Sequence, residues 1–145
     1  MDKNCIFCDI SSKKIPAHII YEDELIMAIL DQRPTRQGHT LIIPKVHVDY
    51  FMNLDKKLAT HIVLTGNKLA KRMMGALKPT PLRVGFVVHG AIPHVHYHIL
   101  PQYEETDITS GTMATCKDGK VVFDHELIPV ANDKEQQAMV KLLSM

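Results

Sequence analysis

The sequence contains few cysteines, no cluster of basic residues and no long apolar run. Three cysteines in 145 residues are odd in number and too few for a disulfide framework, and they fit a reducing compartment. The 17 basic and 16 acidic residues nearly cancel, which argues against a groove that binds nucleic acid. The chain starts without an apolar signal segment, and no run approaches the roughly 18 apolar residues of a membrane span. We therefore expect a cytoplasmic protein with no nucleic-acid or membrane partner.

The hydrophobic pattern predicts one α+β domain. A chain of 145 residues with 46% hydrophobic content is long enough for one core and too short for two typical domains. Apolar residues at helical spacing predict one long amphipathic helix over residues 53–77, with Asn53 or Asp55 as its N-cap. The expected strands lie at residues 19–21, 25–30, 39–43, 82–88 and 94–100. Their short connections indicate an antiparallel meander with one main helix.

Residues 103–145 form a region of different character. Asp118-Gly119 stands between two β-rich runs and is a strong hairpin signal. Asn132, followed three residues later by Glu135, resembles a capping box and predicts a helix that continues to about Leu143.

The most informative stretch is residues 94–100, His-Val-His-Tyr-His-Ile-Leu. In a strand, successive side chains point to opposite faces, so His94, His96 and His98 would share one face. Pro93 and Pro101 bracket the run, which suits a short strand better than a helix interior. Three interpretations remain open: a solvated or core-satisfied row, a metal site, and a catalytic site with a histidine nucleophile.

A second candidate site is the pair Cys5-x-x-Cys8. A lone pair of this kind fits a redox couple, half of a zinc site, or two small buried residues. His47 is of interest as a third partner for the two cysteines. Asp31 falls at the end of a predicted strand, where a carboxylate projects into a cleft or caps the turn before Pro34.

Taken in order along the chain, several motifs resemble those of the histidine-triad (HIT) superfamily of nucleotide hydrolases and transferases. The resemblance covers about residues 4–102, and the ordered set is more specific than the triad alone. The matching stretches are residues 5–10, 15–17, 21–24, 30–34, 38–45 and the triad with Pro101.

The resemblance implies a fold and an activity. The expected fold is an antiparallel five-stranded meander sheet with one long helix packed on it, formed by residues 1–102. Residues 103–145 would be a C-terminal extension, with a hairpin and a short helix, packed on the same domain. The implied activity is hydrolysis at the α-phosphate of nucleoside phosphoramidates or related nucleotide conjugates, through a nucleotidyl-histidine intermediate. The alternatives are a dinucleoside polyphosphate hydrolase and a weakly catalytic nucleotide-binding module.

The resemblance also assigns roles to individual residues. His96 matches the nucleophile, and His98 and His39 match the phosphate-side histidines, with His94 completing the catalytic set. Asp31 matches the carboxylate that holds ribose hydroxyls. The residues expected to bind the purine nucleotide are Phe7, Ile10, Leu30, Asp31 and, through its backbone N–H, Gly90.

The sequence departs from the family pattern at two places. Many members carry Gln-Ser or Gln-Thr just before the triad, where this chain has Gly90-Ala91, so a pair of side-chain hydrogen bonds to phosphate is missing. The arginine often found after the motif's proline is Gln102 here. Both changes bear on substrate and rate more than on reaction type, and the first motivates the alternative of a binding module.

Two further expectations concern zinc and assembly. Cys5, Cys8, His47 and His94 would form a closed Cys₂His₂ site for structural zinc, because His47 follows the strand expected beside the triad strand. Similar zinc sites occur in some HIT branches. The family resemblance and the exposed edges of a small sheet also predict a homodimer that pairs through the long helix and an edge strand.

Overall fold

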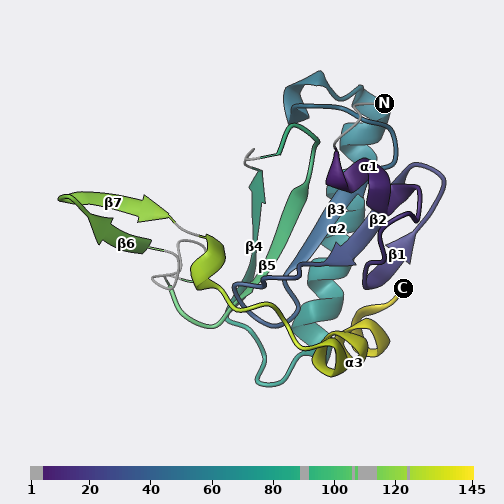
Figure 1. The fold of residues 1–145 in the computed structure, drawn as a ribbon. Coiled ribbons are helices and arrows are strands. Elements are labelled where there is room, and N and C mark those ends of the chain that lie inside the picture. Colours follow the sequence, from purple (N-terminus) through teal and green to yellow (C-terminus); the bar gives the residue numbers. More distant parts are fainter. Residues whose placement is uncertain (1–4, 89–91, 106, 108–113, 124) are drawn as a thin grey trace.

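The computed structural model describes residues 5–88, 92–105, 107, 114–123 and 125–145. A five-stranded sheet carries a 21-residue helix on one face, and a separate hairpin and a shorter helix follow (Figure 1). In chain order the elements are α1 (Ile6–Ser11), β1 (Ile19–Glu22), β2 (Ile26–Leu30), β3 (Thr40–Pro44), a 3₁₀ turn (Phe51–Asn53), α2 (Lys56–Ala76), β4 (Arg83–Val88), β5 (Tyr97–Gln102), β6 (Ala114–Lys117), β7 (Lys120–Phe123), a 3₁₀ turn (His125–Leu127) and α3 (Asp133–Leu143).

The sheet is antiparallel throughout, with strand order β1-β2-β3-β5-β4. The predicted antiparallel five-stranded sheet with one long helix is confirmed, but the meander is wrong for its last two strands. Helix α2, roughly 32 Å long, carries the chain from β3 to the far edge, where β4 forms. The chain then turns back and inserts β5 between β3 and β4. This crossover brings the histidine run beside β3, in the middle of the sheet.

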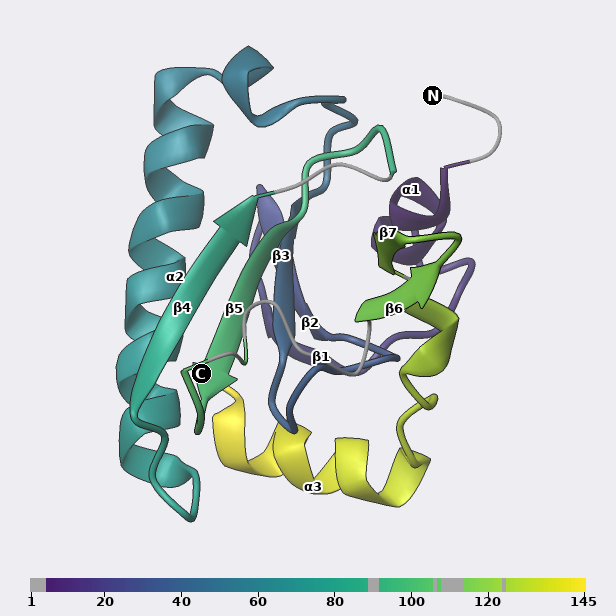
Figure 2. The same cartoon turned by 90° about the vertical axis from the view of Figure 1, so that its left-hand side faces the viewer.

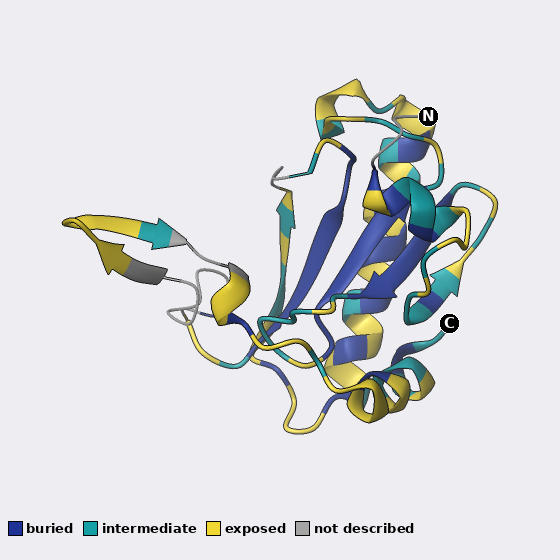
Figure 3. Ribbon diagram, viewed as in Figure 1, coloured by how far each residue is buried: buried dark blue, intermediate teal, exposed yellow. Residues whose placement is uncertain are grey.

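One face of the sheet packs on α2 in a mainly apolar core. The buried stripe of α2 includes Leu58, Ile62, Leu69 and Met73, which meet side chains from β2, β3 and β5. The helix begins after Asp55, whose carboxylate accepts a hydrogen bond from the Leu58 N–H. Of the two N-caps considered, the structure thus selects the second. In Figure 3 the central strands β2, β3 and β5 are buried, whereas the edge strands β1 and β4 are partly exposed.

The opposite face packs on α1. In β2 and β3, alternate residues turn to this side: Met27 and Ile29, and Leu41 and Ile43. They form a second cluster with Phe7 and other N-terminal residues. The site described below lies on this face.

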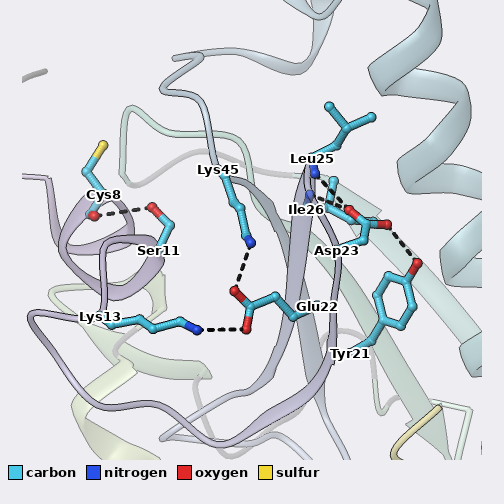
Figure 4. A network of polar contacts seen from close by, with 9 residues as sticks. All are labelled: Cys8, Ser11, Lys13, Tyr21, Glu22, Asp23, Leu25, Ile26 and Lys45. Carbon is cyan, nitrogen blue, oxygen red and sulfur yellow. Dashed lines mark hydrogen bonds and ion pairs between the residues drawn. The ribbon is translucent and has the colours of Figure 1, made fainter.

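The turn between β1 and β2 is fixed by Asp23 (Figure 4). One carboxylate oxygen accepts from the N–H groups of Leu25 and Ile26 at 2.8 and 2.9 Å, and the other from the Tyr21 hydroxyl at 2.7 Å. His61 of α2 lies 2.6 Å from the same carboxylate, which ties the turn to the helix. Burial alone would raise the pKa of Asp23, but these hydrogen bonds hold it well below its usual range.

The predicted hairpin and helix of the C-terminal region are both present. Asp118 and Gly119 have φ values of 51° and 72°, as a tight two-residue hairpin turn requires. Asn132 caps α3 by accepting from the Lys134 N–H. Leu143 is fully buried in the α2 core cluster, so α3 packs on the sheet domain. The domain boundary at residue 102 itself stays a prediction.

In the described part of the chain, no helix combines the length and the apolar character that crossing a bilayer needs. Cytoplasmic location stays a prediction from the sequence.

Candidate functional site

The three triad histidines do not share one strand. Strand β5 begins at Tyr97, so only His98 lies within it, while His94 and His96 belong to the segment that leads into it. The Val95 N–H bonds to the Val48 carbonyl instead of to a sheet neighbour, which explains why the ladder starts later. The predicted inward face is nevertheless confirmed, because Val95, Tyr97 and Ile99 all lie in the core cluster on the α2 side.

His96 is held in one tautomer by its own backbone neighbour. Its Nδ1 lies 2.7 Å from the carbonyl oxygen of His94, and a carbonyl can only accept, so Nδ1 carries the proton. In the neutral ring the lone pair is then on Nε2. The side chain is buried, and burial lowers the pKa of His96, although the carbonyl bond acts in the opposite direction. His96 is therefore a neutral, oriented imidazole of the kind that nucleophilic catalysis requires.

His39 and His98 form a hydrogen-bonded pair beside it. The Nε2 atom of His39 lies 2.9 Å from Nδ1 of His98, and the Thr35 N–H donates to Nδ1 of His39 at 3.3 Å. Because an amide N–H only donates, neutral His39 donates from Nε2 to His98, and His98 carries its own proton on Nε2. The rings of His96 and His98 are 5.0 Å apart. The pair thus places an N–H donor close to the His96 ring.

Asp31 stands at the end of β2, next to this pair. One of its carboxylate oxygens accepts from the Arg33 N–H at 2.8 Å, and the other lies 3.5 Å from Nδ1 of His39. Its backbone N–H donates to the His39 carbonyl at 2.9 Å. The carboxylate is thereby aimed toward the histidines while remaining partly exposed.

Of these groups, Asp31, His96 and His98 line a cleft of about 250 Å³. The rest of the cleft is mainly apolar, and the ring of Phe7 lies 5.1 Å from that of His96. The lining residues are Ile6, Phe7, Ile10, Ala17, His18, Ile29, Leu30, Asp31, Gln32, Leu41, Ile92, His96 and His98. An apolar pocket with a polar end suits a flat base joined to a charged group.

The structure brings most of the predicted binding residues together. Phe7, Ile10, Leu30 and Asp31 all line the cleft. Gly90 lies outside the described residues. The sequence did not point to His18, which also lines the cleft. Its carbonyl accepts a hydrogen bond from the Leu30 N–H, so its position follows from the pairing of β1 with β2.

A second polar cluster lies behind the cleft, where α1 meets the segment before β5. One ligand atom each from Cys5, Cys8, His47 and His94 lie within 4.8 Å of one another. The Sγ of Cys5 is 3.2 Å from Nδ1 of His94, and the Sγ of Cys8 is 3.3 Å from Nδ1 of His47. Sulfur and nitrogen ligands of one tetrahedral zinc ion stand about 3.5 Å apart, so the four atoms fit a metal site.

The chemistry of the four groups agrees with that spacing. Nε2 of His94 donates to the Pro44 carbonyl at 2.9 Å, which leaves the Nδ1 lone pair toward the cysteines. Burial, together with neighbouring Cys5, raises the pKa of Cys8 to about 11. The thiol is thus not an activated redox nucleophile, and a bound cation would have to displace its proton.

The chain resembles known proteins over most of its length. The HIT domain family model matches residues 12–105. The chain is 33% identical over 105 residues to the adenosine 5'-monophosphoramidase HNT1 of Saccharomyces cerevisiae, which covers 72% of this chain and 66% of that protein. It is 35% identical over 106 residues to the adenosine 5'-monophosphoramidase hnt1 of Schizosaccharomyces pombe, covering 70% and 77% of the two chains.

A solved structure extends the resemblance to nearly the whole chain. The zinc-bound histidine triad family protein of Mycobacterium smegmatis is 25% identical, with a TM-score of 0.68. The match covers 97% of this chain and 95% of that one. With the ordered motifs, the antiparallel sheet and the family match in agreement, the chain belongs to the HIT domain family.

Proposed function

We propose that the protein hydrolyses purine nucleoside phosphoramidates, or related nucleotide conjugates, at the α-phosphate. The observation that carries this proposal is the tautomer of His96, whose Nε2 lone pair belongs to a buried, neutral ring on the wall of the cleft. The two phosphoramidases among its relatives support a phosphoramidate as the substrate class.

The reaction proceeds in two displacements at phosphorus. Nε2 of His96 attacks the α-phosphorus, the bond from phosphorus to the leaving amine breaks, and the amine nitrogen takes the electron pair and a proton from a solvent water. A water molecule then attacks the phosphorus of the nucleotidyl-histidine and gives up a proton to solvent, which releases the nucleoside monophosphate and restores His96. Two easier steps thereby replace one difficult step.

The neighbouring groups bind and orient the nucleotide. His98, which is hydrogen-bonded to His39, donates a hydrogen bond from its Nε2–H to a non-bridging oxygen and stabilises the charge that develops there. Asp31 accepts hydrogen bonds from the ribose hydroxyls, and Phe7, Ile10 and Leu30 enclose the base. Gly90, through its backbone N–H, is proposed on the phosphate side from the sequence alone.

We propose that Cys5, Cys8, His47 and His94 hold a structural zinc ion. The donor set and its spacing support this, as does the zinc-bound relative. A zinc ion there has no open position for substrate, so it supplies stability and not Lewis-acid chemistry. By fixing the ring of His94, the site also fixes the carbonyl that orients His96.

We also propose that the protein is a homodimer. Within the described chain, β4 pairs on one side with β5 and forms an edge of the sheet. Phe86 and Val88 of this strand, and Val63 of α2, expose apolar side chains. A second copy would cover both the edge and the patch. Light scattering at micromolar protein should give the dimer mass, and a monomer mass would contradict it.

A substrate panel tests the proposed activity. Adenosine and guanosine phosphoramidates and dinucleoside polyphosphates are offered to the wild type and to His96→Asn, with His61→Asn, far from the cleft, as the control. The expected result is phosphoramidate turnover by the wild type and the control only. Preference for dinucleoside polyphosphates would favour that alternative. Nucleotide binding without any turnover would identify a binding module instead.

A further inference from the structure

The loop of residues 31–39, between β2 and β3, carries both Asp31 and His39, and it is held from outside the sheet as well as by its own bonds. Within the loop, the Asp31 N–H donates to the His39 carbonyl and the His39 N–H to the Arg36 carbonyl. The Arg33 and Thr35 N–H groups donate to the side chains of Asp31 and His39. The hydrogen bonds and the ion pair that hold it from outside come from residues of the C-terminal region, after the family match ends at residue 105. Figure 2 shows α3 lying across the end of the sheet where β3 begins.

Hydrogen bonds join the C-terminal region to successive residues of the loop. The side-chain amide of Gln136 donates to the Asp31 carbonyl at 2.7 Å, and the Ala131 N–H donates to the Gln32 carbonyl at 2.7 Å. The guanidinium of Arg33 donates to the Ile128 carbonyl at 2.6 Å.

An ion pair between partly exposed Arg36 and a buried carboxylate also holds the loop. Arg36 lies 2.7–2.8 Å from the carboxylate of Asp107, whose side chain is only 3% exposed. The other carboxylate oxygen of Asp107 accepts from the N–H groups of Tyr103 and Glu104. A buried carboxylate bound in this way is a fixed anchor and not a mobile surface charge. We call Asp107, Ile128, Ala131 and Gln136 the C-terminal clamp.

Gln136 is the member of the clamp closest to the proposed chemistry. It is 4% exposed and reaches from α3 to the peptide group of the residue that would bind the ribose. Without the amide donor, the Asp31 carbonyl would lose a buried partner and the backbone would shift to find another. The Asp31 carboxylate is only 3.5 Å from His39, so even a small shift would change both contacts.

We propose that the C-terminal clamp positions the 31–39 loop, with Gln136 as a positioning residue that sets the Asp31 carboxylate for the ribose hydroxyls. This rests on the proposed function in taking a nucleotide as the ligand. It assigns to the segment beyond the family match a part in nucleotide binding by the cleft of the same chain.

The test compares two substitutions that each remove one hydrogen bond between a side chain and a backbone carbonyl. Gln136→Met removes the donor to Asp31, and Arg72→Met removes the donor from α2 to the Leu142 carbonyl, at the other end of α3. Calorimetry with adenosine 5'-monophosphate should show about tenfold weaker binding for Gln136→Met and less than twofold for Arg72→Met. Gln136→Leu, which also lacks the donor and carries no charge, should behave as Gln136→Met and replaces it if that variant does not fold.

Two further measurements distinguish a positioning role of Gln136 from a purely structural one. In an Asp31→Ala background, Gln136→Met should cause no additional loss, because its effect passes through Asp31. The 2',3'-dideoxy nucleotide should bind the wild type and Gln136→Met equally. Additive losses, or equal weakening by both methionine variants, would overturn the proposal.

The outcomes also separate this inference from the proposed activity. Wild-type binding without turnover would defeat the hydrolase alone. Wild-type affinity in both Gln136 variants would defeat the clamp alone. A wild type that binds no nucleotide would defeat both.

Discussion

His94 and His96 stand two residues apart, and each donates a hydrogen bond to a backbone carbonyl, but through opposite ring nitrogens. His94 donates from Nε2 to Pro44 and turns Nδ1 to the cysteines. His96 donates from Nδ1 to His94, so its Nε2 lone pair belongs to the wall of the cleft. The two imidazoles thus present different ring nitrogens, because each is oriented by a different backbone carbonyl.

The two polar clusters that these histidines belong to or lie next to also differ, in their ligand atoms and in their position relative to the cleft. The cluster of Cys5, Cys8, His47 and His94 is rich in sulfur and closed around its own ligand atoms, as structural zinc prefers. The cluster of Asp31, His39 and His98 has no sulfur, and two of its members, Asp31 and His98, line the cleft. We infer that metal binding and catalysis are separable functions joined by one backbone carbonyl, that of His94.

The largest expected effect separates the two histidines. His96→Asn should lower kcat at least about 10,000-fold while the protein keeps its zinc and its affinity for adenosine 5'-monophosphate. His94→Asn should instead lose the metal. Steady-state kinetics and elemental analysis of both variants provide the measurement. Equal zinc loss in the two variants would show that the sites are not separable.

A smaller loss of rate is expected from His39→Asn. Without the His39 donor, the orientation of His98 and the tautomer that puts its proton on Nε2 are no longer enforced. We expect kcat to fall about 100-fold, as for loss of one oriented donor to a transition-state oxygen, with zinc content unchanged. A change in KM alone would mean that the pair binds substrate without stabilising the transition state.

Removal of one zinc ligand should affect stability before it affects chemistry. Cys8→Ala should lose stoichiometric zinc and lower Tm by about 10 °C, because binding of the metal to the folded state alone adds to its stability. The exposed Cys116 offers a matched control, and Cys116→Ala should change neither quantity. Full zinc content in Cys8→Ala would remove that residue from the ligand set.

The smallest effect concerns Asp23, which is remote from both clusters. The pKa of Asp23 is lowered in the folded state, so its contribution to stability is present above the unfolded value of about 4 and is lost as pH falls. Asp23→Asn should cost about 2 kcal/mol of unfolding free energy at pH 7, and less at pH 2. Urea titration at the two pH values measures this. A cost independent of pH would contradict the role of the charge, and activity should not change.

Local signals predicted the elements well. The spacing of Leu58, Ile62 and Leu69 defined α2, and Asp118-Gly119 defined the hairpin turn, because each depends on neighbouring residues only. The strand order could not be read in this way. Whether β5 pairs with β3 or stands outside β4 is decided by the path of α2 and by long-range packing.

The parts of the candidate site that lie in short sequence motifs could be predicted, and the parts that depend on long-range contacts could not. The alternation of histidines pointed to the right segment, but the late start of β5 depends on a bond to Val48, which no local pattern reveals. The contact of Gln136 with Asp31 joins residues 105 positions apart and had no sequence signal, since a glutamine in an amphipathic helix is ordinarily a solvent-facing residue.

The most direct test of the central claim is to trap the intermediate. The wild type is mixed with an adenosine phosphoramidate, quenched within one turnover and digested, and the peptide containing residues 94–98 is analysed by mass spectrometry. We predict an adenylyl group on His96, absent from His96→Asn and present in His61→Asn. Rapid product formation with no adduct, or an adduct on His94 or His98, would contradict the account.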